Sequence, residues 1–146
     1  MTEIALRRAL LSDAPALQKV FAAAYASYQE RLKDLPDVSG GLADDIATHI
    51  VWIAETDGQI AGGVVLVQSG DAFHLANIAV HPDHGGKGIG RALITNAEDF
   101  ARDKAASELA LATHVGMPGN LALYRHLGWQ ETGRAGNKVY MVKRLT

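Results

Sequence analysis

The sequence predicts a mixed α/β fold, in which helices cover a mostly antiparallel sheet of six to seven strands. Two strand-like segments, residues 51–56 and 59–68, flank Asp57-Gly58, a dipeptide that favours the tight turn between antiparallel strands. Apolar residues recur at helical spacing in residues 17–24 and 89–100. Along the chain, the segments read as a strand, two helices, three antiparallel strands, a helix, a strand, a helix and a hairpin, which gives about four helices.

Length and composition are those of a single globular domain. The chain has 146 residues, of which 48% are hydrophobic and 21% are charged, enough for one core without disulfides or metals to hold it. It contains no cysteine, which excludes disulfides, thiolate metal ligands and a cysteinyl intermediate in catalysis. We expect residues 1–146 to form one domain.

The charge and hydropathy patterns predict neither nucleic-acid binding nor membrane insertion. A formal net charge of -2 provides no general attraction to nucleic acid or to anionic lipid. No apolar run approaches the roughly twenty residues of a membrane span, and the first residues lack the pattern of a signal peptide. A cytoplasmic location is therefore expected.

The N-terminal part is expected to hold a strand and two helices. Residues 4–9 alternate as a strand does, and Ser12-Asp13-Ala14-Pro15 combines an N-cap, a favourable negative charge and a first-turn proline. The segment 35–41 breaks the pattern, and residues 42–50 predict a second, shorter helix. The apolar face of the first helix consists of Leu17, Val20, Phe21 and Ala24.

A strand, a glycine-rich turn and a long helix follow the hairpin. Residues 72–80 predict the strand, and the helix begins at Gly88, with Glu98 and Arg102 able to pair on its outer side. One buried stripe of this helix consists of Ile89, Leu93, Ala97 and Phe100.

The last third of the chain predicts a strand, a short helix and a hairpin. Residues 108–113 form the strand, Asn120 is the expected N-cap of the helix, and Gly128 fits its left-handed C′ position. The closing hairpin is expected to pair residues 130–133 with 139–145.

The turn at residues 85–91 is the most informative segment. Four of its residues are glycines, which lack the Cβ atoms that would keep a ligand away from the main chain. Such a strand-to-helix turn presents several backbone N–H groups at the positive end of a helix, and so predicts a pyrophosphate site. An ordinary solvated connection is the alternative.

Other ligand patterns do not fit. A P-loop needs Ser or Thr after its lysine, whereas Lys87 is followed by glycine, and the dinucleotide fingerprint needs glycine where Arg91 stands. His81 and His84 have a superficially metal-like spacing, but no third ligand is evident in the sequence, so no metal is expected.

The turn resembles motif A of the GCN5-related N-acetyltransferase (GNAT) superfamily, Arg/Gln-x-x-Gly-x-Gly/Ala. Gly88 and Gly90 match the two glycines, whereas Gly85 stands at the Arg/Gln position and so departs from the motif. The missing side chain should weaken the pyrophosphate site without abolishing it, because backbone amides carry most of the attraction and Lys87 or Arg91 can supply charge.

About thirty residues further on, the chain resembles motif B of the same superfamily. In that motif, Asn opens a short helix, Tyr lies one turn later and Gly-Phe/Trp ends it, matched here by Asn120, Tyr124 and Gly128-Trp129. The resemblance extends from residue 4 to residue 146 and is sharp in these two motifs.

The resemblance implies a GNAT-like acyl-CoA N-acyltransferase fold, in which the strand ending near Val80 and the strand at residues 108–113 run parallel and splay apart. Acetyl-coenzyme A would bind in that slot, with its pyrophosphate on the glycine-rich turn. The residues implied in cofactor binding are Ile78, Ala79, Val80, Gly85, Gly86, Lys87, Gly88, Ile89, Gly90, Arg91, Asn120 and Tyr124.

The resemblance also implies catalytic roles. The N–H near Val80 would bind the thioester carbonyl, the Tyr124 hydroxyl would protonate the leaving sulfur, and Asn120 would hold the pantetheine or a water. Many relatives carry a Glu on the strand before the turn, but this chain has Leu75-Ala76-Asn77 there. Asn77, on the face of Leu75 and Ala79 by alternation, is the candidate for orienting the acceptor or a water, with a plain polar residue within the strand as the alternative. The candidate bases are His74, His81, Glu55 and a chain of waters.

The expected function is that of an N-acetyltransferase domain, which moves acetyl from acetyl-CoA directly to a primary amine of a small molecule or protein. The alternative is a non-catalytic acyl-CoA sensor, and a nucleotide-binding regulator ranks third. A homodimer stays open.

The resemblance implies that the first helix, residues 35–41 and the final hairpin shape the acceptor site, because these segments flank the slot in that fold. Tyr25, Tyr28 and Trp52 are candidates for lining it, with core packing as the alternative for Trp52. The segment 28–57 is rich in Asp and Glu, which would suit a cationic amine, although a solvated helix face and loop explain it too.

Overall fold

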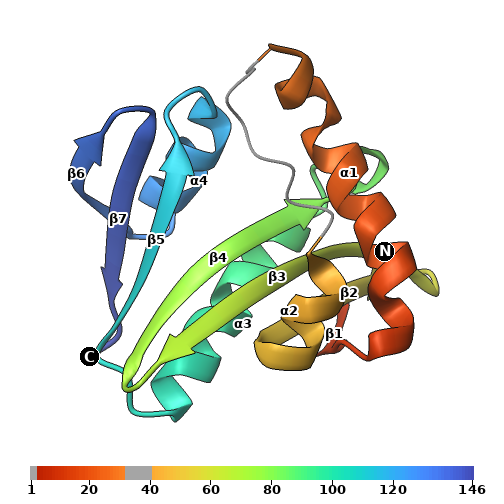
Figure 1. Cartoon of the computed structure of the whole chain (residues 1–146), viewed down its shortest axis with the longest axis horizontal. Coiled ribbons are helices and arrows are strands. Elements are labelled where there is room, and N and C mark those ends of the chain that lie inside the picture. Colours follow the sequence, from red (N-terminus) through yellow and green to blue (C-terminus); the bar gives the residue numbers. More distant parts are fainter. Residues whose placement is uncertain (1–2, 32–40) are drawn as a thin grey trace.

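The computed structural model describes residues 3–31 and 41–146, and this part of the chain forms a seven-stranded sheet with four α-helices (Figure 1). The strands are β1 (Ala5–Arg8), β2 (Ile50–Thr56), β3 (Gln59–Ser69), β4 (Ala72–Val80), β5 (Glu108–His114), β6 (Gln130–Ala135) and β7 (Lys138–Arg144). The helices are α1 (Ala14–Arg31), α2 (Leu42–Thr48), α3 (Ile89–Asp103) and α4 (Pro118–His126).

The sheet has the order β1-β2-β3-β4-β5-β7-β6, and its pairs are antiparallel except for β4 and β5, which are parallel. The mixed, mostly antiparallel fold is therefore confirmed. Asp57 and Gly58, both with positive φ, form the predicted tight turn between β2 and β3.

The predicted splay between β4 and β5 is confirmed. The two strands pair from Phe73 and Leu109 to Leu75 and Leu111, and β4 then continues to Val80 away from its partner. Figure 1 shows the two strands diverging toward the end that carries α4. A strand that leaves its neighbour exposes main-chain donors and acceptors, so this end of β4 is free to bind a ligand.

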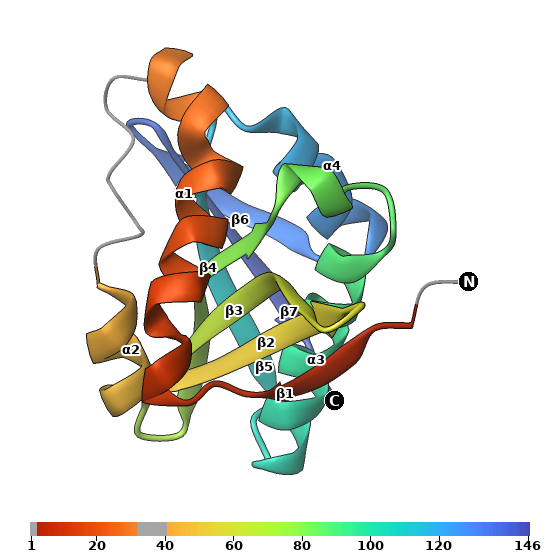
Figure 2. The ribbon, with the colours of Figure 1, turned by 90° about the vertical axis from the view of Figure 1, so that its right-hand side faces the viewer.

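Helices cover both faces of the sheet. Figure 2 shows α1 and α2 on one side and α3 with α4 on the other. On the α1 side, Leu17 and Phe21 pack with Val65 of β3, and on the other side Leu93 and Ala97 pack in the larger cluster that includes α4. Each face therefore has its own apolar core, and the sheet separates them.

A β-bulge at Ala76 changes which residues of β4 face which core. Leu75 pairs with Leu66, but Asn77 pairs with Val65, so Ala76 is an extra residue in β4. Leu75 consequently packs on the α3 side, whereas Asn77 and Ala79 face α1. The expectation that Asn77 shares the face of Leu75 is wrong because strict alternation fails at a bulge.

The start of α1 differs from the sequence expectation. A short 3₁₀ turn precedes the helix, and the carboxylate of Asp13, not the hydroxyl of Ser12, accepts the N–H of Leu10 at 2.7 Å. Two hydrogen bonds from the Arg7 guanidinium hold the pKa of Asp13 below its usual value. The same guanidinium reaches Glu55 on β2, so β1, β2 and the start of α1 are tied together.

Other element boundaries differ as well. The second helix ends at Thr48, and β2 begins at Ile50. Asn120 is not an N-cap, because α4 begins two residues earlier and the N–H of Asn120 already bonds the carbonyl of Met117. The final turn is shorter than predicted, since β6 extends to Ala135. Gly128, with φ +96°, does take the predicted left-handed conformation.

Gly62→Ala is expected to destabilise the fold by about 2–3 kcal/mol, because overpacking of this kind is costly. A Cβ atom at Gly62 would lie 2.7 Å from the carbonyl oxygen of Ala79 and 3.2 Å from Ile89 Cγ2. Urea unfolding measures the effect. Gly133→Ala on β6 is the matched control, because its Cβ would meet nothing within 4 Å. Equal unfolding midpoints for the two variants would contradict the prediction.

Candidate active site

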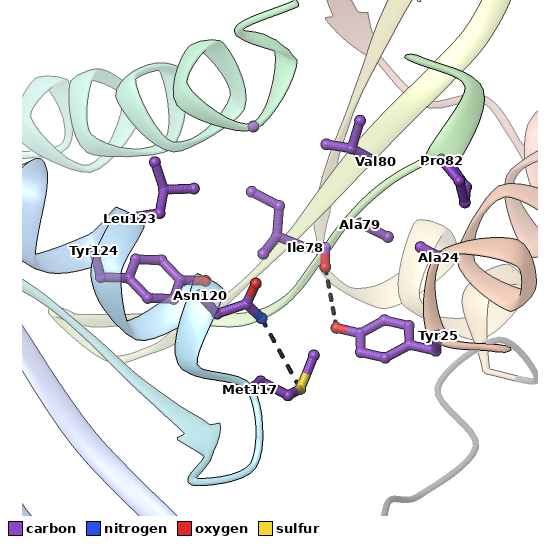
Figure 3. A pocket seen from close by; sticks show the side chains of 11 residues that line it. Ala24, Tyr25, Ile78, Ala79, Val80, Pro82, Met117, Asn120, Leu123 and Tyr124 are labelled. Atoms are coloured by element: carbon purple, nitrogen blue, oxygen red, sulfur yellow. Dashed lines mark hydrogen bonds between the residues drawn. The ribbon is translucent and has the colours of Figure 1, made fainter. Parts of the chain in front are cut away.

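A cavity of about 290 Å³ lies beside the diverging end of β4 (Figure 3). Helices α1, α3 and α4 each contribute to its walls. Its lining consists of Ala24, Tyr25, Ile78, Ala79, Val80, Pro82, Gly90, Met117, Asn120, Leu123 and Tyr124. Six of these were predicted from the sequence as cofactor-binding residues: Ile78, Ala79, Val80, Gly90, Asn120 and Tyr124.

Tyr124 is held by close packing on α4. Its side chain is 3% exposed, and its ring centroid lies 5.6 Å from that of Trp129. Burial, and to a smaller extent the nearby Tyr25, raises the pKa of the Tyr124 phenol well above its usual value near 10. The phenol is therefore a neutral proton donor throughout the physiological range, and Figure 3 shows its hydroxyl pointing into the cavity.

Tyr25 reaches the same cavity from the opposite side, on α1. Its hydroxyl lies 2.8 Å from Asn77 Oδ1 and 3.1 Å from the carbonyl oxygen of Ile78. These contacts connect α1 to β4 just after the bulge. Asn77 itself is half-buried next to the cavity rather than in its lining, with its carboxamide oxygen turned toward Tyr25.

The main chain at the end of β4 faces two ways. The N–H of His81 donates to Ala61 of β3 at 2.8 Å. Successive residues of a strand direct their N–H and C=O groups to opposite edges, so Val80 directs its N–H toward the edge from which β5 has diverged. The Ile78 carbonyl points the same way, as its contact with Tyr25 indicates.

The glycine-rich turn leads directly into α3. Gly86 and Gly88 have φ values of +76° and +81°, and Gly88 is the N-cap residue of the helix. The N–H groups that open a helix have no partner within it, so those from Gly88 onward can bind an anion. Gly85 differs from this set, because its N–H already donates to Pro82 at 3.2 Å.

The side chains of the turn point to different surroundings. Ile89 is 1% exposed and belongs to the core, so only its main chain is available to a ligand. Lys87 and Arg91 are exposed, and Lys87 Nζ lies 3.2 Å from His84 Nδ1. Lys87 and Arg91 are the two positively charged side chains of the turn.

None of the three side chains suggested as bases lines the cavity. Glu55 hydrogen-bonds Arg7, and His81 accepts the N–H of Asp83 at 3.1 Å through Nδ1. His74 is exposed on the paired part of β4.

Trp52 packs edge-to-face on Phe100, with ring centroids 6.3 Å apart, which confirms core packing for that residue. The Tyr28 side chain and residues 35–40 lie outside the described part.

Four lining residues were not predicted: Ala24 as a cavity residue, Pro82, Met117 and Leu123. Their side chains carry no acidic or basic group, so their residue types do not mark them as site residues. For Leu123 a signal exists, since it adjoins Tyr124 in the short helix. Met117 lies just before the first residue of α4, and the sequence analysis predicted that this helix begins later in the chain.

Within residues 3–31 and 41–146, no three His, Cys, Asp or Glu side chains gather as they would around a metal ion. No helix in the same ranges has the length and hydrophobicity to cross a membrane.

The sequence profile of the Acetyltransferase (GNAT) family matches residues 15–129. The chain therefore belongs to this family, and the resemblance seen in the two motifs is confirmed.

Curated relatives carry N-acetyltransferase names. N-acetyltransferase 8 of Rattus norvegicus is 31% identical over 108 residues, covering 70% of this chain and 48% of the relative. N-acetyltransferase family 8 member 3 of the same species is 34% identical over 88 residues, covering 56% and 39%. The chain thus spans about half the length of the curated relatives it matches, or less.

Solved structures share the fold. The PaiA N-acetyltransferase of Thermoplasma acidophilum, in complex with coenzyme A, has a TM-score of 0.85 at 20% identity, covering 97% of this chain and 99% of that one. The ribosomal-protein-S18-alanine N-acetyltransferase of Escherichia coli has a TM-score of 0.82 at 21% identity, covering 99% and 95%.

Proposed function

We propose that this chain transfers acetyl from acetyl-CoA directly to a primary amine of a small molecule or a protein. One observation carries the proposal: the protonated phenol of Tyr124, the diverging end of β4 and the start of α3 all border one cavity. Family membership and the coenzyme A held by the PaiA structure support the donor.

The glycine-rich turn fits a pyrophosphate. A Cβ atom at Gly86 or Gly88 would meet no protein atom within 4 Å, so the space above these residues is open to a ligand. The N–H groups of residues 86–91 would bind the phosphate oxygens, while Lys87 and Arg91 supply the charge that Gly85 cannot. Ile78 and the carbonyl group of Val80, on the edge left by β5, would pair with the pantetheine amides.

Acyl transfer needs an oxyanion site and an acid. As the amine attacks the thioester carbonyl, the N–H of Val80 would stabilise the oxyanion that forms. When the tetrahedral intermediate collapses, the C–S bond breaks and the Tyr124 hydroxyl would give its proton to the departing sulfur. Asn120, in the same lining, would hold the pantetheine or a water, and Asn77 would orient the acceptor or a water.

The amine must lose a proton before it attacks, because a lysine-like amine is neutral in roughly one molecule in a few thousand at pH 7. Among the described residues, the cavity lining contains no carboxylate and no imidazole. This composition favours proton removal through water over His74, His81 or Glu55.

Thiol release from acetyl-CoA in the presence of a panel of primary amines tests the proposal. Amine-dependent release, with the acetylated amine identified by mass spectrometry, is the expected result. Slow release that no amine accelerates would instead favour the non-catalytic acyl-CoA sensor. Gly85 at the Arg/Gln position of the motif is consistent with that alternative. Protection against heat by ATP or NAD, but not by coenzyme A, would favour a nucleotide-binding regulator.

The pH dependence of turnover should reflect the buried phenol. Because the pKa of Tyr124 is raised, its proton is lost only at higher pH than in an exposed tyrosine. We therefore expect kcat to show no falling limb between about pH 8 and pH 10, measured at saturating substrates. A falling limb below about pH 10 that disappears in Tyr124→Phe would show that the phenol titrates normally.

We also propose that residues 1–146 act as one N-acetyltransferase domain. The continuous seven-stranded sheet of the described residues, which joins β1 near the start to β6 and β7 near the end, supports this assignment. Proteolysis of the intact chain by a low level of trypsin should leave one core fragment that retains coenzyme A binding.

A further inference from the structure

An ion pair between the buried Glu98 and the partly buried Lys143 helps to link three elements, α3, β7 and α4. Glu98 on α3 is 5% exposed, and its Oε1 accepts a hydrogen bond of 2.7 Å from Nζ of Lys143 on β7. The sequence predicted that Glu98 pairs with Arg102 on the outer side of the helix, which is wrong. Arg102 pairs with the exposed Asp99 instead, at 2.8 Å.

Lys143 also binds the end of α4. Its Nζ donates to the carbonyl oxygen of Leu127 at 2.7 Å, and Leu127 is the C-cap residue of that helix. A cation at a helix C-terminus is favourable, because the last carbonyl groups carry partial negative charge. Gly128, one residue on, has φ +96°, and a Cβ there would meet Lys143 Cε at an ordinary contact distance of 3.6 Å, so the left-handed backbone rather than lack of space favours glycine here.

Glu98 reaches Tyr124 by a second route. Its Oε2 accepts the indole N–H of Trp129 at 3.3 Å, and Trp129 is 2% exposed. The Trp129 ring packs on the Tyr124 ring, and the main-chain N–H of Trp129 donates to the main-chain carbonyl of Tyr124 at 3.0 Å. The Glu98 carboxylate therefore holds both Trp129, which packs against the Tyr124 ring, and Lys143, the cation at the C-terminal end of α4.

We propose that Glu98 and Lys143 are positioning residues that fix the Tyr124 hydroxyl relative to the glycine-rich turn. The turn opens α3 at one end, and Glu98 lies further along the same helix. Through Glu98, the helix that would bind the donor pyrophosphate is joined to the helix that carries the acid. The proposal rests on the proposed function, in which Tyr124 protonates the leaving sulfur.

A double-mutant cycle tests it. Glu98→Gln and Lys143→Met are each expected to lower kcat about 5- to 20-fold, with KM for acetyl-CoA changed less than about 2-fold. Added to Tyr124→Phe, Glu98→Gln should have almost no further effect, because the hydroxyl it positions is gone. A further loss as large as in the native background would overturn the proposal, since it would indicate a general structural effect.

Two controls accompany the cycle. Asp99→Asn removes the neighbouring carboxylate of the exposed pair and should leave kcat within about 2-fold of the native value. Lys143→Arg keeps a cation with donors for both Glu98 and Leu127, and should retain more activity than Lys143→Met. Equal losses in Lys143→Arg and Lys143→Met would count against positioning by these hydrogen bonds.

Hydrogen exchange provides a readout that does not depend on activity. In Glu98→Gln and Lys143→Met, amides of α4 from Leu121 to Leu127 should exchange at least about tenfold faster, whereas Asp99→Asn should leave them unchanged. Unchanged exchange in both variants would overturn the proposal. If Tyr124→Phe retained full turnover while exchange rose as expected, the acid role of Tyr124 would fail and the anchoring of α4 would stand.

Discussion

Tyr124→Phe is expected to lower turnover roughly 10- to 1,000-fold while coenzyme A binding stays nearly unchanged. The substitution removes one oxygen atom and keeps the ring that packs on Trp129. The hydroxyl is the group that would donate a proton to the leaving sulfur, and its raised pKa keeps it protonated, whereas the pyrophosphate would be held by the start of α3, on another element. Turnover and binding should therefore separate.

Two measurements check this result. Steady-state thiol release gives kcat, and calorimetric titration with coenzyme A gives the dissociation constant of native and mutant chains. Tyr140→Phe is the matched control, because this tyrosine lies on β7, is 39% exposed and does not line the cavity. A Tyr124→Phe chain that turns over as fast as the Tyr140→Phe chain would exclude Tyr124 as the acid.

The sequence predicted the fold well where local signals and the topology agree. Asp57-Gly58 favours one turn type, and both residues adopt the positive φ that this turn requires. The strand at residues 72–80 has its predicted bounds, because a polar turn precedes it and a proline-containing turn follows it. Helix ends were predicted less well, since α4 is opened by Pro118 rather than by the better capping residue Asn120.

The site was predicted from motifs, and its finer geometry depends on contacts between distant residues. The bulge at Ala76 arises from the pairing of β3 with β4, which no single segment encodes, and it turns Asn77 toward Tyr25, 52 positions away in the chain. Glu98 fits a solvent-exposed i,i+4 pair by sequence spacing. Its burial results from Lys143, 45 residues away, and from Trp129.

Gly88→Ala is expected to weaken coenzyme A binding about 10- to 100-fold, since a methyl group would intrude where the pyrophosphate must approach the main chain. Its Cβ would contact no protein atom within 4 Å, so the only new neighbour is the ligand itself. The residue has φ +81°, and an L-residue in this conformation costs about 1–2 kcal/mol, so some loss of stability accompanies the loss of affinity.

Gly70→Ala separates these two effects. Gly70 lies in the turn between β3 and β4, has φ +62°, and a Cβ there would also meet nothing within 4 Å. The two variants should lose similar stability in urea unfolding, because both place alanine in the left-handed conformation. In calorimetry, the dissociation constant for coenzyme A should rise in Gly88→Ala alone. If both variants bound coenzyme A as the native chain does, the N–H groups that open α3 would not be its phosphate site.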